Sequence, residues 1–337
     1  MQLAIALNDA GLPSEAVALR GDDAPDRLPL ASLGHRGRSP SALRHGRRLA
    51  RDFDVVIGHG SDTLLAGAAI TWGTSRPFIY QLIGDPRFWG DVRLGQLRVG
   101  WPLRRAAAVV ALWPAAAEAL SAMYDIEPEA VHVIPNGRDA THFRPPSHSE
   151  RAQARVALNL GPDDRVACWV GALSWEKQPL LAIEAARANP GTRLVIAGDG
   201  PEATKAAAGA AAAPGLVSVL GSVDDVRTVY WASDLLVMTS RTEGLPGVLV
   251  EAALCGLPAV APDVGGIGSL VDRSTGELVP ADASASDYAA AIDTVLEDGA
   301  ARGEVMRRRC AAGYSMATTV DAWRDLLTAV AGSGTPT

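Results

Sequence analysis

The stretch that decides the fold is DLLVMTSRTEGLPGVLVEAALCGLPAVAPDVGG, residues 234–266. Two short apolar runs, at 235–238 and 259–261, have the character of buried strands, and the residues between them show helical periodicity from about Pro246 to Cys255. Gly256 follows the last periodic residue and is expected to end the helix. Strand, helix and strand in this order predict a parallel βαβ unit.

Two glutamates flank the start of this predicted helix. Pro246 and Gly247 leave the first backbone amides without intrahelical partners, and these amides lie at the positive pole of the helix, where a phosphate can bind. Glu251, about one turn into the helix, could then reach the hydroxyls of the molecule that carries the phosphate, and Glu243 lies in the loop before it. Two solvated glutamates on an ordinary α/β unit are the alternative, so the rest of the chain has to decide.

The alternation of strand and helix continues along the whole chain. Further apolar runs occupy residues 54–57, 78–82, 109–112, 131–134, 166–170, 194–197 and 216–220. Helical patterns separate them, which predicts parallel sheets, and 337 residues are enough for two α/β domains. The stretch HFRPPSHSERAQ breaks the pattern at Pro145 and Pro146. It predicts a linker between a first domain at 1–145 and a second at 146–312.

Composition places the chain among globular proteins, with 48% hydrophobic and 20% charged residues. The longest apolar run, 106–117, is interrupted by Pro114, and the N-terminus has no basic region followed by an apolar core, so we expect neither a membrane span nor a secretory signal. Three cysteines far apart in the sequence argue for reduced core residues and against a disulfide framework or a metal site. These features predict a cytoplasmic protein.

The net charge of −7 argues against nucleic acid as a partner. The excess of acidic residues lies entirely in the second half of the chain, since residues 1–150 contain 16 acidic and 16 basic side chains. The segment HRGRSPSALRHGRRLAR, residues 35–51, contains six arginines and no acidic residue. A basic helix face of this kind can dock on anionic lipid head groups at the inner face of a membrane, and a solvated helix face is the alternative.

Ligands of doubly wound sheets bind beyond the carboxyl ends of the strands, so the loops after the strands are candidate sites. In GALSWEKQ, Gly171 precedes Lys177, one of only two lysines in the chain, whose ammonium group could meet a diphosphate. Gly221 in GSVDD lets a flat base approach the backbone, and Asp224 is expected to cap the next helix. Gly265 and Gly266 lie at another expected helix start, where bare amides could face a phosphate or a sugar. Each signal is weak when taken singly.

Together, in this order and spacing, these blocks resemble the retaining glycosyltransferases of family 4. The matching blocks are VHVIPNGRDATHF (131–143), VGALSWEKQP (170–179), LVIAGDGPE (194–202), LGSVDDVRTVYWASDLLVMTSRTEGLPGVLVEAALCGLPAVAPDVGGI (220–267) and TGELVP (275–280). The resemblance implies the GT-B architecture, in which two Rossmann-like domains with doubly wound parallel sheets face a cleft. It also implies a helix within 313–337 that crosses back onto the first domain, and packing on the second domain is the alternative.

The resemblance implies roles for individual residues. Glu251 would bind the ribose of a nucleotide-sugar donor, Glu243 would contact the donor sugar, and Lys177 would bind the diphosphate. The full donor set is Gly171, Lys177, Gly221, Val223, Glu243, Leu245, Pro246, Gly247, Val248 and Glu251, in which Glu243 and Lys177 are the catalytic candidates. The acceptor hydroxyl would attack on the face from which the phosphate departs. The family uses no divalent cation, so neither a metal nor a cofactor is expected.

Three departures from the family pattern leave a second interpretation open. Ala172 stands where the family has an arginine, and Ile83 stands where many members have a histidine, which leaves His59, Gly84 and Asp85 as acceptor-side candidates. The first strand and its glycine-rich loop are missing from the pattern, for which a misplaced start codon is the favoured explanation. A homologue that binds a nucleotide or a partner without turnover is therefore the alternative.

Overall fold

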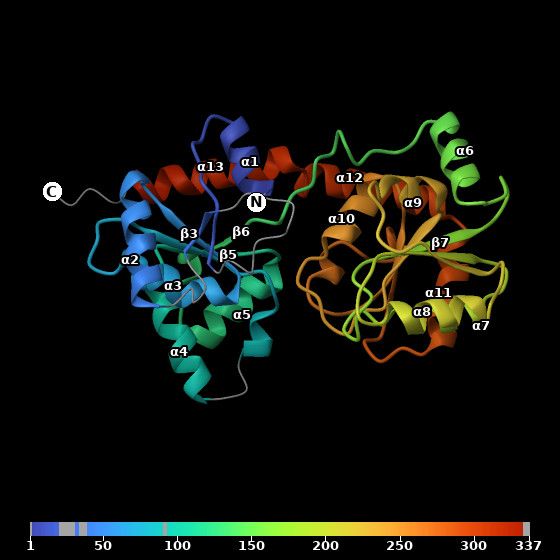
Figure 1. The fold of residues 1–337 in the computed structure, drawn as a ribbon, viewed down its shortest axis with the longest axis horizontal. Helices are drawn as coiled ribbons and strands as arrows, with labels where there is room; N and C mark the ends of the chain where they lie inside the picture. Colours follow the sequence, from blue (N-terminus) through green and yellow to red (C-terminus); the bar gives the residue numbers. More distant parts are fainter. Residues whose placement is uncertain (1, 20–30, 34–38, 90–92, 333–337) are drawn as a thin grey trace. The chain divides into compact units, whose positions relative to one another are not determined.

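The computed structural model describes residues 2–19, 31–33, 39–89 and 93–332. The chain divides into two compact units (Figure 1). The first consists of Met1–Asn136 together with Met316–Thr337, and the second of Gly137–Ser315. Each unit is built around its own parallel β-sheet, as the alternation of strand and helix predicts.

The second unit contains a six-stranded sheet in the order β12-β11-β10-β7-β8-β9, with every pair parallel. Its strands are β7 (Val166–Val170), β8 (Arg193–Ala197), β9 (Val217–Val219), β10 (Leu235–Val237), β11 (Ala259–Pro262) and β12 (Gly276–Val279). Five of them confirm predicted strands, and β12 was not predicted. The chain runs from β7 to the edge at β9 and returns to β10 on the other side of β7. The sheet therefore has a topological switch point between β7 and β10.

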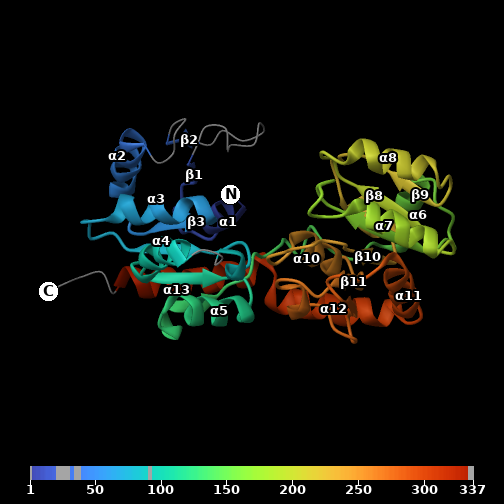
Figure 2. The same ribbon diagram turned by 90° about the horizontal axis from the view of Figure 1, so that it is seen from below.

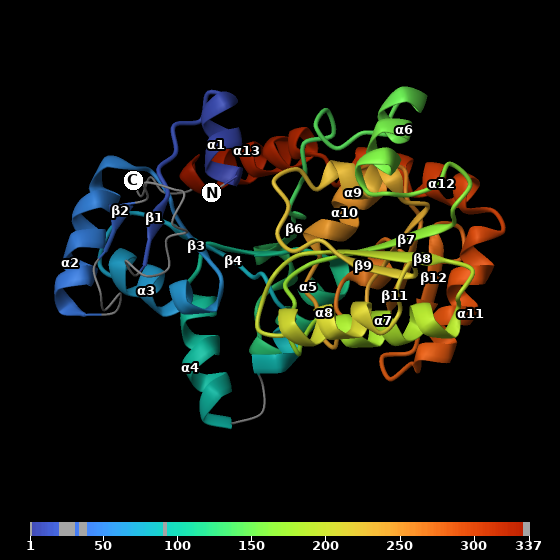
Figure 3. The same ribbon diagram turned by 45° about the vertical axis from the view of Figure 1, so that its right-hand side comes forward.

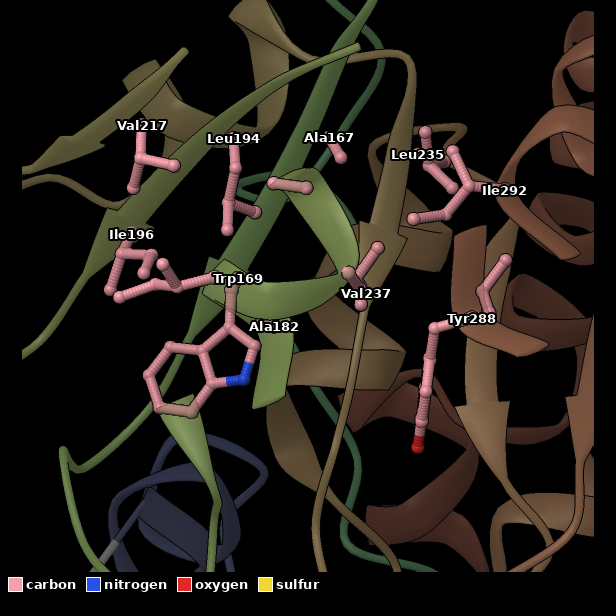
Figure 4. Packing of buried hydrophobic residues seen from close by; sticks show 14 of the residues in the cluster. Ala167, Trp169, Ala182, Leu194, Ile196, Val217, Leu235, Val237, Tyr288 and Ile292 are labelled. Carbon is pink, nitrogen blue, oxygen red and sulfur yellow. The ribbon is translucent and has the colours of Figure 1, made fainter. Parts of the chain in front are cut away.

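Helices cover both faces of this sheet, with α7, α8 and α11 on one side and α9, α10 and α12 on the other (Figures 1 and 3). The helices are α6 (His148–Ala157), α7 (Pro179–Ala188), α8 (Ala203–Ala211), α9 (Arg227–Ala232), α10 (Gly247–Leu254), η5 (Ile267–Ser269), α11 (Ala285–Leu296) and α12 (Gly299–Gly313). The core between the sheet and α7, α8 and α11 includes Trp169, Leu194, Ile196, Val237, Tyr288 and Ile292 (Figure 4).

One local prediction in this unit is wrong. Asp225, and not Asp224, lies against the start of α9, where its Oδ1 accepts a hydrogen bond of 3.0 Å from the Arg227 amide. Because α9 begins at Arg227, Asp225 is the residue two positions before the first helical amide, and the sequence pattern placed the helix start one residue too early.

The first unit contains a four-stranded parallel sheet in the order β3-β4-β5-β6. Its strands are β3 (Val56–His59), β4 (Phe78–Gln81), β5 (Ala108–Ala111) and β6 (Val131–Val133), and a separate parallel pair is formed by β1 (Val17–Ala18) and β2 (Ala31–Ser32). The helices are α1 (Gln2–Asp9), α2 (Pro40–Leu49), η2 (Ala50–Asp52), α3 (Ser61–Thr71), η3 (Pro86–Trp89), α4 (Arg93–Arg104), α5 (Pro114–Tyr124), η4 (Pro128–Ala130) and α13 (Met316–Gly332). Within the described residues, β3 lies at one edge of this sheet.

The last helix, α13, belongs to the first unit although it lies at the other end of the sequence (Figure 2). It packs with α1 against β4 and β5. Trp323 is fully buried in this core, beside Ile79 and Val110 of the sheet and Leu7 of α1. The amphipathic face predicted from Trp323 and Leu326 is confirmed, since both side chains are buried.

Replacing Trp323 with alanine is expected to destabilise the first unit by about 3–5 kcal/mol, the cost of a large cavity in a packed core. Urea unfolding monitored by circular dichroism measures this change. Asp325→Ala is the matched control, because Asp325 lies on the exposed face of the same helix. It should change the free energy of unfolding by no more than about 0.5 kcal/mol. Equal stability of the two variants would contradict the packing of α13 described above.

Candidate functional site

The loops that follow β7 and β10 are neighbours because these two strands pair at the switch point. Lys177 in the first loop and Glu243 in the second form an ion pair, with 2.9 Å between Nζ and Oε1. The Glu243 side chain is 8% exposed and the Lys177 side chain 27% exposed. The same ammonium group lies 3.4 Å from Oε1 of Glu176. The structure thus brings the two catalytic candidates together at the place where doubly wound sheets bind ligands.

A buried hydroxyl group connects these two loops by hydrogen bonds. Thr239, two residues after β10, is 1% exposed, and its Oγ1 lies 2.9 Å from the carbonyl oxygen of Lys177 and 2.8 Å from that of Gln178. Oγ1 also accepts a hydrogen bond of 3.0 Å from Nε1 of Trp169 in β7. Thr239 was not predicted as a site residue, because a threonine at a strand end has no distinctive pattern in the sequence.

The loop after β11 supports the same region. Gly265 has φ +58, and a Cβ atom at this position would lie 2.0 Å from the carbonyl oxygen of Glu243. The next residue, Gly266, donates a hydrogen bond of 2.8 Å from its amide to the Gly244 carbonyl. A side chain at 265 would therefore require the backbone of the Glu243 loop to move, which explains the glycine pair noted in the sequence.

The start of α10 has the predicted form. Pro246 is the N-cap residue, and α10 begins at Gly247. The first hydrogen bond of this turn runs from the Leu249 amide to the Pro246 carbonyl, at 3.2 Å. The amides of Gly247 and Val248 come before Leu249 and belong to the helix start, where amides have no partner within the helix. Leu245, before the cap, is buried. These first amides of α10 lie at its positive pole, in the segment that follows Glu243.

Glu251 is held by two side chains that were not predicted. Nε of Arg138 donates a hydrogen bond of 2.7 Å to Oε1, and the Tyr230 hydroxyl lies 3.2 Å from Oε2. Burial and the nearby Glu251 carboxylate raise the pKa of Tyr230 well above its usual value, so this phenol stays protonated and donates. The Glu251 side chain is 15% exposed and the Arg138 side chain 19%. Because 113 positions separate the two partners, the pair has no signature in the sequence.

The remaining donor-side glycines meet at the carboxyl ends of β7, β8 and β9. The amide of Gly171 donates to the Ala197 carbonyl at 3.1 Å, and the amide of Gly198 donates to the Gly221 carbonyl at 2.8 Å. Gly198 has φ +144, and a Cβ there would lie 1.8 Å from the Gly171 carbonyl oxygen. Val223, two residues beyond Gly221, is half-buried. The predicted base-binding backbone is therefore one packed set of turns.

The acceptor-side candidates lie in the first unit and have separate partners. His59, at the end of β3, has its Nδ1 2.7 Å from Oε1 of Gln81, and Nε2 of Gln81 donates 3.1 Å to Oδ1 of Asn136. Asp85 is 6% exposed, and its carboxylate accepts three hydrogen bonds of 2.6–3.0 Å from the Arg87 guanidinium. Gly84 is the residue before Asp85 and is exposed, as is Ile83 before it.

The hydrogen bonds of Gln81 determine the tautomer of His59. Since Gln81 donates through Nε2, its Oε1 accepts, and Nδ1 of His59 carries the proton. Desolvation lowers the pKa of His59 below 6.5, although the hydrogen bond to Gln81 opposes this change. The ring is therefore neutral at pH 7, and its Nε2 has a lone pair that can accept a hydrogen bond from a hydroxyl group.

Titration of His59 by NMR is expected to give a midpoint below 6.5 and an Nδ1–H tautomer at pH 7. Gln81→Leu removes the hydrogen bond that opposes the effect, so the midpoint should fall further. In the unaltered protein, His59 binds a proton less readily in the folded state than in the unfolded state. Protonation of His59 therefore lowers the free energy of unfolding as the pH falls below 6.5. A midpoint for His59 above 6.5 would contradict the assignment.

Neither a metal-binding cluster nor a membrane-spanning helix occurs among the described residues. No group of three or more histidine, cysteine, aspartate or glutamate side chains there is arranged to hold a metal ion. Among the same residues, no helix combines the length and apolarity needed to cross a membrane. The three cysteines, Cys168, Cys255 and Cys310, are buried and unbridged, and burial raises the pKa of each thiol to about 12.

The basic segment 35–51 is described only from residue 39 onward. There it forms α2 and the turn η2. Arg47 is bound to the end of α3, where it donates to the carbonyls of Ile70 at 3.1 Å and Ala69 at 3.2 Å. Arg44 and Arg48, one helical turn apart on α2, are exposed. One of the predicted surface arginines is therefore a structural tie between helices.

Comparison with known families gives two matches that together span most of the chain. Residues 150–312 match the family described as Glycosyl transferases group 1, and residues 1–142 match Glycosyltransferase Family 4. The D-inositol 3-phosphate glycosyltransferase of Mycobacterium marinum is 34% identical over 225 residues, which are 61% of this chain and 46% of that protein. The protein of the same name from Mycobacterium bovis is 36% identical over 219 residues, 59% of this chain and 44% of that protein. The matched region thus spans less than half the length of these relatives.

Solved structures share the fold at lower identity. Anabaena Alr3699/HepE in complex with UDP superimposes with a TM-score of 0.79 at 22% identity, covering 90% of this chain and 86% of that one. A glycosyltransferase from Rickettsia africae gives a TM-score of 0.82 at 14% identity, covering 98% and 93%. With two Rossmann-like parallel sheets and both family matches in place, the chain belongs to the group 1 glycosyltransferases of the family 4 type and has the GT-B fold.

Proposed function

We propose that this protein is a retaining glycosyltransferase that moves a sugar from a nucleoside diphosphate sugar to a hydroxyl group of an acceptor. The Lys177–Glu243 pair carries the proposal, with its 2.9 Å contact between loops at the switch point of the second sheet. The helix α10 begins at Gly247, so its first amides follow Glu243 closely along the chain. A cation, a shielded carboxylate and free amides form a site suited to a phosphorylated ligand.

The donor would be bound in three parts. Glu251 would accept hydrogen bonds from the ribose hydroxyls, and Lys177 with the first amides of α10 would bind the diphosphate. The packed turns around Gly171 and Gly221 would face the base. The solved relative from Anabaena is described in complex with UDP, which favours a UDP-linked sugar as the first donor to test.

The chemical step follows from where charge develops. The bond between the anomeric carbon and the phosphate oxygen breaks, which leaves an oxocarbenium-like sugar and a nucleoside diphosphate anion. Lys177 and the α10 amides would stabilise the negative charge on the leaving group, and Glu243 would lie beside the positive charge on the sugar. The acceptor oxygen then bonds to the same face of the anomeric carbon, and its proton passes to the departing phosphate. No divalent cation takes part in this scheme.

The acceptor would be a saccharide, a lipid-linked sugar or another hydroxylated small molecule. The relative from Mycobacterium marinum is named for D-inositol 3-phosphate, which favours a polyol of this kind as a first acceptor to test. Nε2 of His59 would accept a hydrogen bond from the acceptor. The exposed Arg44 and Arg48 of α2 would provide contact with an anionic membrane if the acceptor is lipid-linked.

Calorimetric titration with UDP, GDP, ADP and their common sugar conjugates tests the donor site. Saturable binding of one nucleotide, followed by turnover of its sugar conjugate, would support the proposal. Turnover that persists in EDTA would support the metal-free scheme, and its loss would overturn that part. Binding without turnover of any conjugate would instead favour the alternative, a homologue that binds nucleotides without catalysis. Binding of none of them would overturn the donor site itself.

A further inference from the structure

Arg138 occupies a defined place at the start of the second unit. Its amide donates a hydrogen bond of 3.0 Å to the Tyr314 carbonyl, and it forms a parallel bridge with Ser315. These contacts tie the beginning of the unit to the segment after α12. These contacts fix the backbone of Arg138, and the hydrogen bond of 2.7 Å from Nε to Glu251 sets the direction of its side chain.

The guanidinium group lies over the first turn of α10. A Cβ atom built on Gly247 would lie 1.8 Å from Nη2 of Arg138 and 2.7 Å from its Cζ, so the guanidinium fills the space that a side chain at 247 would take. A cation at the positive end of a helix is unfavourable unless an anion compensates it. Glu251 supplies one negative charge through its 2.7 Å hydrogen bond with Nε.

The Glu251 carboxylate keeps capacity for a ligand in this arrangement. Arg138 engages Oε1 and Tyr230 engages Oε2, so each oxygen makes one of these contacts and can accept a further hydrogen bond. Two vicinal hydroxyls, as in a ribose, match two such acceptors. Nη2 of Arg138, meanwhile, points over the amide end of α10, where the proposed function places a diphosphate.

We propose that Arg138 is a donor-binding residue that joins the ribose and diphosphate subsites. Arg138 holds Glu251 in position through Nε, while Nη1 donates a hydrogen bond of 3.2 Å to the Gly137 carbonyl. Its Nη2 binds the diphosphate and supplies a second cation in addition to Lys177. The proposal rests on the function proposed above. It separates a phosphate-binding role for Arg138 from a purely structural role as the partner of Glu251.

Affinities for UDP and UMP separate these roles, because the two ligands differ by one phosphate. For Arg138→Gln, loss of a charge-assisted contact predicts about tenfold weaker binding of UDP or more, and a smaller loss for UMP. Arg138→Lys keeps the charge and should recover part of the UDP affinity. Gly247→Ala keeps Arg138 in the sequence, but the new methyl group would displace its guanidinium from the start of α10. This variant should also lose more affinity for UDP than for UMP.

Arg165→Gln is the matched control, since Arg165 forms an exposed ion pair with Asp293 in the same unit. It should leave both affinities unchanged. Equal losses for UDP and UMP in the Arg138 variants would overturn the proposal and leave Arg138 only as a support for Glu251. Unchanged UDP affinity would overturn it as well. If the unaltered protein binds neither UDP nor UMP, the proposed donor site is wrong, and this result differs from the two that concern Arg138 alone.

Discussion

Glu251→Ala is expected to weaken the binding of UDP by about 100-fold, because two hydrogen bonds from hydroxyls to a charged acceptor contribute about 1.5 kcal/mol each. The two oxygens of Glu251 are already oriented by Arg138 and Tyr230, so the carboxylate does not have to be ordered when the ligand binds. Calorimetry at constant salt measures the effect. Glu251→Gln keeps the shape of the side chain but removes its charge, so its affinity for UDP should lie between those of the unaltered protein and Glu251→Ala.

Glu304→Ala provides the control for this measurement. Glu304 lies on α12 of the same unit and is paired with Arg307 and Arg308. Its removal deletes a carboxylate and leaves arginines unpaired, as Glu251→Ala does, but on α12 and not in the first turns of α10. UDP affinity should be unchanged in this variant. If Glu251→Ala and Glu304→Ala bind UDP equally well, the assignment of the ribose subsite is wrong.

In the second unit, the sequence predicted the individual strands and helices better than it predicted which of them are neighbours. The stretch 234–266 contains its own strand, helix and turn signals, so β10, the start of α10 and β11 could be predicted locally. Whether Lys177 meets Glu243 depends on strand order, because β7 and β10 are separated by two intervening strands in the sequence yet pair in the sheet. Only the fold turns two weak loop signals into a contact.

The residues that the sequence could not predict are those whose partners are distant. Arg138 stands in a block that matched the family, but nothing near it in the sequence indicates that its guanidinium would reach Glu251. Thr239 is inconspicuous until Trp169 and two carbonyls converge on its hydroxyl. Asp85 was a candidate because it follows a strand, yet its carboxylate is occupied by Arg87. The positions of these residues after strands could be predicted, but their hydrogen-bond partners could not.

Lys177→Gln is expected to lower the rate of donor turnover by about 100-fold or more, the usual cost of removing one group that stabilises charge in the transition state. Lys177 would interact most strongly with the diphosphate as the glycosidic bond breaks, because its negative charge rises at that moment. Donor affinity should change less than the rate. Release of UDP from a UDP-sugar, with water in place of the acceptor, measures this turnover.

The chain offers an unusually close control for this variant, since its only other lysine is Lys205. Lys205 is 68% exposed and pairs with Glu202 at 3.1 Å, so Lys205→Gln also breaks a lysine–glutamate ion pair in the second unit. Its turnover should equal that of the unaltered protein. Glu243→Gln should lower the rate as Lys177→Gln does, and the double variant should lose less than the product of the two effects, because the 2.9 Å contact couples them. Independent effects of the two changes would show that the pair does not act as one unit, and undiminished turnover in Lys177→Gln would remove the lysine from the catalytic site.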